Sequence, residues 1–201
     1  SYAGFSREIF LLVNNIILVV AMAMILLGTL YPLIHEAIYG EANRVSVGAP
    51  YFNTLFLPLM ALLAFFLGVA TFSRWKRTSL DHLKQQLWKV AIASVSLGIL
   101  IPLLVTGEGN MGAMLAMVLA LWIVFGIAQD IWDKTANKAS RLDGLRSLSL
   151  SLSYYGMQLA HFGMAVIILG ICLTSNYSIE EDRRMAPGDS LTIGAYTFTF
   201  E

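Results

Sequence analysis

The sequence lacks the residues and motifs on which most soluble enzymes depend. It has a single cysteine, Cys172, so it forms no internal disulfide and carries no CxxC redox motif. No phosphate-binding glycine loop, HExxH motif, GxSxG motif or Cys/His zinc spacing occurs in it. Because no side chain stands out as an acid, a base or a nucleophile, we assign no catalytic residue. We interpret Cys172 as a small buried apolar residue.

Charge is also scarce, since Asp, Glu, Lys and Arg make up only 13% of the 201 residues and sum to a net charge of zero. Apolar residues account for 57% of the sequence, and the mean hydropathy is +0.70. These values lie outside the range of ordinary soluble domains. A helix that crosses a bilayer needs about 20 apolar residues, and the sequence has five such runs, at 9–30, 52–72, 87–106, 111–131 and 154–174. It therefore predicts an all-α polytopic membrane protein with a bundle of five transmembrane helices over residues 1–174.

Basic residues gather on one side of this predicted bundle. Ten of the 13 Lys and Arg residues precede the first span or lie near the loops that join spans two to three and four to five. Only Arg44, Arg183 and Arg184 fall on the other side. By the positive-inside rule we expect the N-terminus in the cytoplasm and the C-terminus outside the membrane.

The residues after 174 have a different character. Charged residues and a Pro-Gly-Asp turn come first, and then Tyr196, Phe198 and Phe200 alternate with threonines. Alternation of this kind is typical of a strand. We expect residues 175–201 to begin a β-rich segment on the outer face, completed by a longer polypeptide or by another subunit.

His161 lies inside the fifth predicted span, in the stretch LSYYGMQLAHFGMAVIILGICL. An ionisable side chain within a membrane is costly and is by default a candidate functional residue. On an ideal helix Met157 and Met164 share its side, while three glycines spaced by seven line the opposite side. The glycines would admit a closely packed helix, and the methionine-lined side suits a flat hydrophobic cofactor such as haem. An imidazole hydrogen-bonded to a neighbouring helix is the alternative.

His35 lies just past the outer end of the first predicted span, and its apolar neighbours favour a position at the membrane interface. A solvated histidine is the alternative. His82 lies in a charged cytoplasmic loop, and we expect it to be solvated. At 1.5 Å per residue, His161 is about 20 Å below the outer end of its helix. His161 and His35 therefore cannot bind the same iron, and if both are ligands there are two metal sites, each without a second histidine from this chain.

Several stretches, taken together, resemble one known family. GTLYPLIH followed by SVGAPYFN, then LAHFGMAVIILG running into YSIEEDRRMAPGDS, are similar to the C-terminal part of the CcmF family, the haem lyase component of bacterial cytochrome c maturation. The resemblance covers nearly the whole chain in the same order. It implies a location in the bacterial inner membrane, with residues 175–201 in the periplasm.

Members of that family hold a haem b within the membrane between two histidines, and present two more histidines at the periplasmic face to haem delivered by a haem chaperone. By motif match, the resemblance implies that His161 binds the iron of the transmembrane haem b and that His35 binds the iron of the delivered haem. The other histidine of each pair belongs to the upstream portion of the family, which also carries a tryptophan-rich segment. That segment is absent here, and we interpret the four scattered tryptophans as interfacial anchors: Trp75, Trp88, Trp122 and Trp132.

In the family's reaction, the two thiols of an apocytochrome CxxCH motif add across the haem vinyl groups and form two thioether bonds. The resemblance implies that the protein holds the porphyrin in register with the thiols, and that the membrane haem supplies the electron that keeps the iron ferrous. Quinol is a candidate donor of that electron. We do not expect activity from this chain alone.

The implied partners are the upstream part of the family, the haem chaperone, and apocytochrome c with its thiol-handling subunits. The lipid bilayer surrounds the chain, and we expect no nucleic acid. Two alternatives are a transporter fragment and a structural membrane anchor of a respiratory complex. Proline-interrupted helices favour the transporter, whereas the absence of paired broken helices and of an intramembrane carboxylate that could couple ions argues against it.

Overall fold

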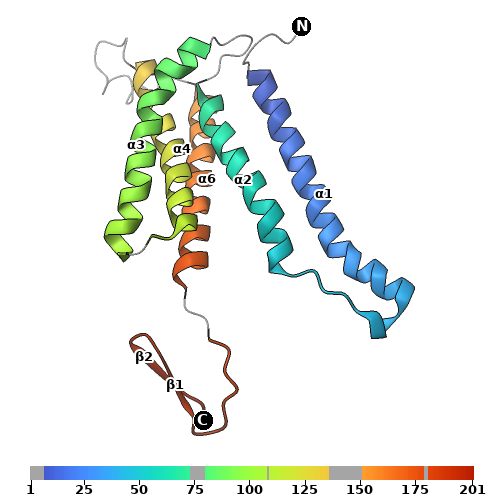
Figure 1. Cartoon of the computed structure of the whole chain (residues 1–201). Helices are drawn as coiled ribbons and strands as arrows, with labels where there is room; N and C mark the ends of the chain where they lie inside the picture. The colour runs from blue at the N-terminus through green and yellow to red at the C-terminus, as the bar shows by residue number, and fades with distance from the viewer. Residues whose placement is uncertain (1–6, 73–79, 108, 136–150, 179–180) are drawn as a thin grey trace.

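The computed structural model describes residues 7–72, 80–107, 109–135, 151–178 and 181–201. In chain order its helices are α1 (Arg7–Tyr39), the short 3-10 helix η1 (Glu41–Asn43), α2 (Ala49–Thr71), α3 (Leu80–Thr106), α4 (Met111–Thr135) and α6 (Leu152–Tyr177). Two strands follow, β1 (Ser190–Ile193) and β2 (Tyr196–Thr199). Figure 1 shows the five long helices running alternately down and up, with the strands beyond the lower end of α6.

The five long helices are each long and apolar enough to cross a membrane. The predicted class, an all-α membrane protein with a short β segment at the C-terminus, is confirmed. The helices extend beyond the predicted spans, because backbone hydrogen bonding does not stop where the apolar run stops. Thus α1 continues through Pro32 to Tyr39 and carries His35 on its last turns, and α3 begins at Leu80, so the backbone of His82 is helical and not in a loop. The solvation expected for the His82 side chain lies outside the described residues.

Helix α4 is the centre of the bundle, since it packs against α2, α3 and α6, whereas α1 packs against α2 at the edge. Two glycines allow the closest approaches. A Cβ atom at Gly98 on α3 would lie only 2.7 Å from the backbone nitrogen of Val118 on α4. A Cβ at Gly68 on α2 would overlap the indole of Trp122 on α4. The close packing of each helix pair therefore depends on a glycine at one position.

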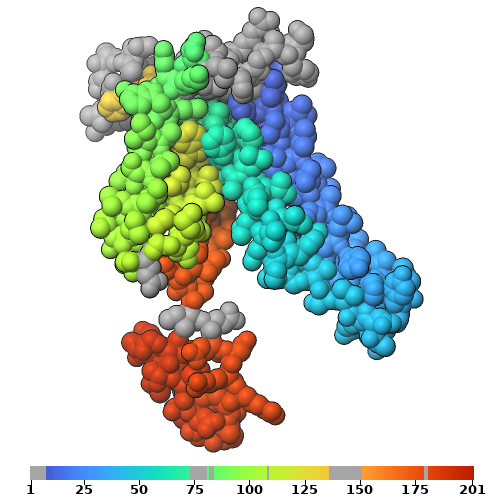
Figure 2. Space-filling model, viewed as in Figure 1, coloured from blue at the N-terminus to red at the C-terminus, as the bar shows by residue number. Residues whose placement is uncertain are grey.

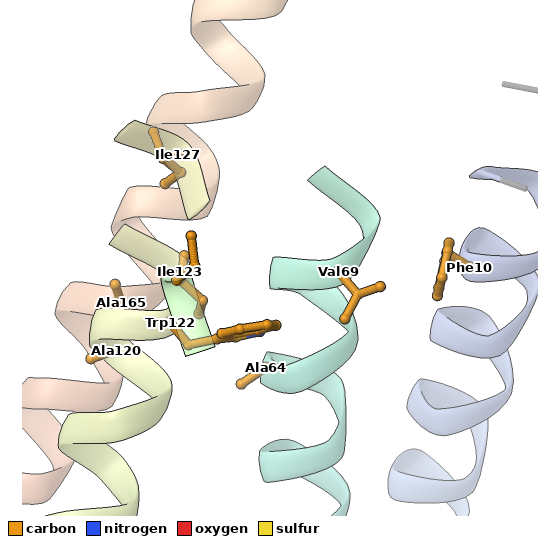
Figure 3. Close-up of a cluster of buried hydrophobic side chains, with 9 residues drawn as sticks. Phe10, Ala64, Val69, Ala120, Trp122, Ile123, Ile127 and Ala165 are labelled. Atoms are coloured by element: carbon orange, nitrogen blue, oxygen red, sulfur yellow. The ribbon is translucent and has the colours of Figure 1, made fainter. Parts of the chain in front are cut away.

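Trp122 lies in the apolar core, where only 7% of it is exposed (Figure 3). Its ring stacks on Phe65 of α2, with 5.8 Å between centroids and 4° between planes, and its Nε1–H donates to the Phe65 carbonyl at 3.1 Å. The interfacial position predicted for Trp122 is wrong, because a backbone carbonyl satisfies the indole N–H that an interfacial tryptophan would direct to water. Trp88 and Trp132 are exposed, and Trp75 lies outside the described residues.

The bundle separates into two arms toward its lower end in Figure 2, one formed by α1 and α2 and the other by α3, α4 and α6. Many large apolar side chains on the outer faces are exposed, including Leu12, Leu104 and Leu159. In a bilayer such surfaces contact lipid tails or other helices, so their exposure in the isolated chain is expected.

The strands β1 and β2 form an antiparallel hairpin in which Ser190 pairs with Thr199 and Ile193 with Tyr196. The two-residue turn begins at Gly194, whose φ of 60° suits the left-handed region that glycine tolerates. Tyr196, Phe198 and Phe200 are all largely exposed. An isolated two-stranded hairpin is at best marginally stable in water, so its aromatic surface is available for further protein.

Candidate functional site

His161 lines a cavity of about 240 Å³ where α1, α2 and α6 meet. The imidazole is half-buried, and Met157, one turn earlier on α6, lines the cavity with it. Met157 and His161 therefore lie on one side of α6, as the helical projection indicates.

The walls of this cavity are mostly apolar. Helix α1 contributes Phe10, Leu11 and Asn14, and α2 contributes an apolar strip that includes Phe66. The rings of Phe10 and Phe66 lie 6.1 Å apart at a tilt of 48°. An imidazole beside aromatic and aliphatic walls suits a flat apolar group that needs one axial nitrogen ligand.

The cavity is partly open, and its volume is below the range of about 300–1,000 Å³ typical of small-molecule sites. If a haem binds here, this chain would supply one ligand and only part of the wall around it. The residues that line the cavity are compatible with one side of a haem site, since they include an imidazole donor and an apolar wall.

His35 lies on α1 between two tyrosines of the same helix. Its ring centroid is 5.9 Å from that of Tyr31 and 4.6 Å from that of Tyr39. The side chain is half-buried, and its Nδ1 is buried without a hydrogen-bond partner among the described residues. The two tyrosines are 53% and 61% exposed, so they leave an aromatic surface open on both sides of the histidine.

An ion pair closes the outer end of α1 beside His35. The Arg44 guanidinium donates from two nitrogens to the Glu36 carboxylate at 2.8 and 3.0 Å. The hydrogen bond from Arg44 to Glu36 raises the pKa of the guanidinium above its usual value. The pair ties the segment after η1 back onto the helix.

The two histidines are far apart. Asn14, at the cavity, and His35 are 21 residues apart on α1, which corresponds to about 32 Å at 1.5 Å per residue. One iron cannot reach both, in agreement with the two separate sites expected from the sequence. Among the described residues no cluster of three or more His, Cys, Asp or Glu side chains could hold a metal ion.

A buried polar cluster joins α4 to α6, one to two turns from His161, and the sequence interpretation missed it. Asp130 is 6% exposed and Gln158 is 4% exposed. The Asp130 Oδ2 accepts hydrogen bonds from the Tyr154 hydroxyl at 2.6 Å, Gln158 Nε2 at 2.8 Å and Lys134 Nζ at 2.7 Å. We call these four residues the Asp130 cluster.

The Asp130 cluster corrects the expectation that the bundle contains no buried carboxylate. Asp130 lies at the end of the predicted fourth span, 111–131, and nothing in its neighbourhood along the sequence indicates what packs over it. The available signal was spacing: Asp130 and Lys134, and Tyr154 and Gln158, are each four residues apart and share a helix face.

Two further expectations concern α6. Cys172 is 5% exposed, which confirms the prediction that it is a small buried residue. Three glycines, Gly156, Gly163 and Gly170, form the stripe on the opposite side of α6. A Cβ atom placed on any of them would meet no atom of a neighbouring described helix within 4 Å. The close helix packing expected on that stripe therefore stays a prediction.

The chain is similar over its whole length to curated proteins named cytochrome c-type biogenesis protein CcmF. It is 45% identical over 204 residues to the one from Pseudomonas fluorescens and 46% identical over 200 residues to the one from Pseudomonas aeruginosa. In both alignments all of this chain is covered, against 30% of the relative. The protein of the same name from Escherichia coli is 40% identical over 199 residues, covering 98% of this chain and 29% of the relative.

No family model matches the chain, and no solved structure matches it. The chain spans about 30% of the length of the curated relatives that it resembles most in these comparisons. The alignments nevertheless extend from one end of the chain to the other, and they include both histidine segments. The chain therefore belongs to the CcmF family of cytochrome c-type biogenesis proteins, of which it represents one region.

Proposed function

We propose that this chain is part of the membrane haem lyase that attaches haem covalently to the CxxCH motif of apocytochrome c. In this proposal His161 would supply one ligand to the iron of a haem b inside the bilayer, and His35 would supply one ligand to the haem that is delivered at the periplasmic face. The observation that carries the proposal is the half-buried imidazole of His161 in an apolar cavity between three transmembrane helices.

The separation of the two sites suits a division of roles. Haem b bound at His161 would supply one-electron chemistry, and the apolar walls around it exclude water and so limit proton and ion access. Some 30 Å away along α1, at the outer surface, His35 holds the delivered haem by its iron. The vinyl groups of the delivered haem are then free to react with the two cysteine thiols. Each thiol adds its sulfur and its proton across the double bond of one vinyl group.

The work of this chain at the outer site is positioning. His35 is fixed on a helix, and the exposed rings of Tyr31 and Tyr39 extend from the imidazole in both directions along it. Holding a flat substrate in register with two thiols contributes to rate through orientation and not through acid–base chemistry. The absence of a catalytic acid or base from the sequence interpretation is consistent with that role.

The second ligand of each haem would come from the upstream region of the family, and the haem chaperone and the apocytochrome would approach from the periplasm. The distribution of basic residues supports an inner-membrane orientation with α1 starting at the cytoplasmic side and the hairpin in the periplasm. Quinol is the proposed source of electrons for the membrane haem.

A transporter remains the competing candidate because of one observation, the buried carboxylate of Asp130. Ion coupling needs a carboxylate with room to exchange its counter-ion, whereas the Asp130 Oδ2 already accepts three hydrogen bonds from its own bundle. The arrangement resembles a fixed contact between helices more than an ion site.

The proposal is tested by measuring covalent c-type cytochrome in cells that carry the full-length protein with either His161→Ala or His35→Ala. Both variants should lose most of the cytochrome, and His82→Ala, at the opposite end of the bundle from His35, should retain it. Normal cytochrome c formation in both histidine variants, at normal levels of the membrane protein, would refute the proposal.

A further inference from the structure

Gln158 precedes His161 by one turn on α6, and only one half of its carboxamide is occupied. Its Nε2 donates to Asp130 Oδ2 at 2.8 Å and lies 2.9 Å from the Tyr154 hydroxyl oxygen. Its Oε1 is buried and accepts no hydrogen bond from any described residue. A buried acceptor without a donor is unfavourable, so this oxygen calls for a partner.

The Asp130 cluster fixes which way this carboxamide faces. The other two groups around Asp130 Oδ2, from Lys134 and Tyr154, are both donors, so this oxygen is an acceptor. Turning the Gln158 amide over would place one acceptor oxygen against another. The amide nitrogen therefore stays on Asp130, and Oε1 is held on the other side, ready for a donor.

The natural donor is the ring of His161. Side chains on a helix lean back toward its N-terminus, onto the residues three and four positions earlier, so the imidazole leans toward Met157 and Gln158. A histidine that binds iron through Nε2 carries its proton on Nδ1, and that N–H is almost always donated to a nearby acceptor.

We propose that Gln158 is a positioning residue for His161, in which Oε1, oriented by Asp130, accepts the Nδ1–H of the imidazole when Nε2 faces the cofactor. This inference rests on the proposed function of His161. The hydrogen bond fixes the ring rotation and the tautomer. It also makes the imidazole a stronger electron donor to iron, which stabilises the ferric form and lowers the midpoint potential.

The test compares two glutamine substitutions in the full-length protein, purified with its haem. Gln158→Met keeps the side-chain volume and removes the acceptor. Gln129→Met is the matched control, because Gln129 also makes a half-buried hydrogen-bonded contact between helices, with Gln86 of α3, but on a different side of α4. The measurements are the midpoint potential of haem b and the electron paramagnetic resonance spectrum of its oxidised form.

We expect Gln158→Met to raise the midpoint potential and shift the resonance positions, while Gln129→Met leaves both at their wild-type values. Asp130→Asn should shift the potential in the same direction and by less, because an Asn amide lets the Gln158 carboxamide turn over. If Gln158→Met does not retain haem, Asp130→Asn decides the question by the same two readings.

A potential and a resonance spectrum unchanged in Gln158→Met would overturn the role of Gln158 and leave the role of His161 intact. A haem b signal that persists in His161→Ala would instead overturn the proposed function, and this inference with it. The two failures are therefore distinguishable in one set of preparations.

Discussion

The surroundings of His161 and His35 differ in the number of helices that build them. His161 faces a cavity walled by three helices, and a buried polar cluster joins its helix to α4 close by. His35 is flanked by two tyrosines of its own helix and by one exposed ion pair. The surroundings of His161 are thus a product of tertiary packing, whereas the described surroundings of His35 come from α1 and the short segment that follows it. Substitutions that disturb helix packing should therefore affect the first site and spare the second.

The largest effect is expected from Asp130→Ala. The change would leave the Tyr154 hydroxyl, the Gln158 amide and the Lys134 ammonium without their shared acceptor. A donor left unsatisfied in the interior costs about 1–3 kcal/mol, and the Tyr154 and Gln158 donors both lose their partner. Unfolding measured in detergent with increasing denaturant should show this loss together with the loss of haem b. A variant as stable as the wild type would contradict the claim that the Asp130 cluster holds α6 to α4.

Gly68→Ala should come next, because its Cβ would overlap the Trp122 indole and force α2 away from α4. Overpacking of this kind typically costs about 1–3 kcal/mol. Gly126→Ala is the matched control, since a Cβ there meets Phe72 at an ordinary 3.5 Å. Thermal unfolding of the two variants should separate them, and equal stability would contradict the close approach of Gly68 to the Trp122 indole.

Tyr39→Ala probes the outer site and should leave the inner one unchanged. The Tyr39 ring lies 4.6 Å from His35, closer than the Tyr31 ring at 5.9 Å, and an aromatic pair contributes about 0.5–1.5 kcal/mol. Titration with ferric haem should show a several-fold weaker outer site in Tyr39→Ala, a smaller change in Tyr31→Ala, and an unaltered haem b spectrum in both. A change in haem b would show that the two sites are coupled.

The smallest effect is expected from Arg44→Ala. The Arg44 side chain is 68% exposed, and exposed ion pairs add little to stability because water screens them. The unfolding midpoint and the haem b content should both match the wild type. A marked loss of haem b in Arg44→Ala would contradict the separation between the outer end of α1 and the inner site.

Properties that follow from local sequence were predictable. The five spans follow from runs of apolar residues, and the strand β2 follows from the alternation of aromatic residues and threonines at 196–200. The helical projection of α6 also placed Met157 on the side of His161, where both line the cavity. These features depend only on residues that are near one another in the sequence.

Properties that depend on which helix faces which were not predictable. Trp122 is buried because the Phe65 carbonyl, 57 residues earlier, satisfies its N–H. Asp130 is buried because Tyr154 and Gln158, 24 and 28 residues later, donate to it. Neither partner can be identified by periodicity within one helix, and the roles of His161 and His35 as haem ligands stay predictions for the same reason.

The central claim is that His161 and His35 serve two different haem sites, and the most direct test is the reduced-minus-oxidised visible spectrum of the purified full-length protein. We expect His161→Ala to abolish the b-type signal and His35→Ala to retain it at the wild-type intensity. A b-type signal that is indifferent to His161, or equally lost in both variants, would contradict the account.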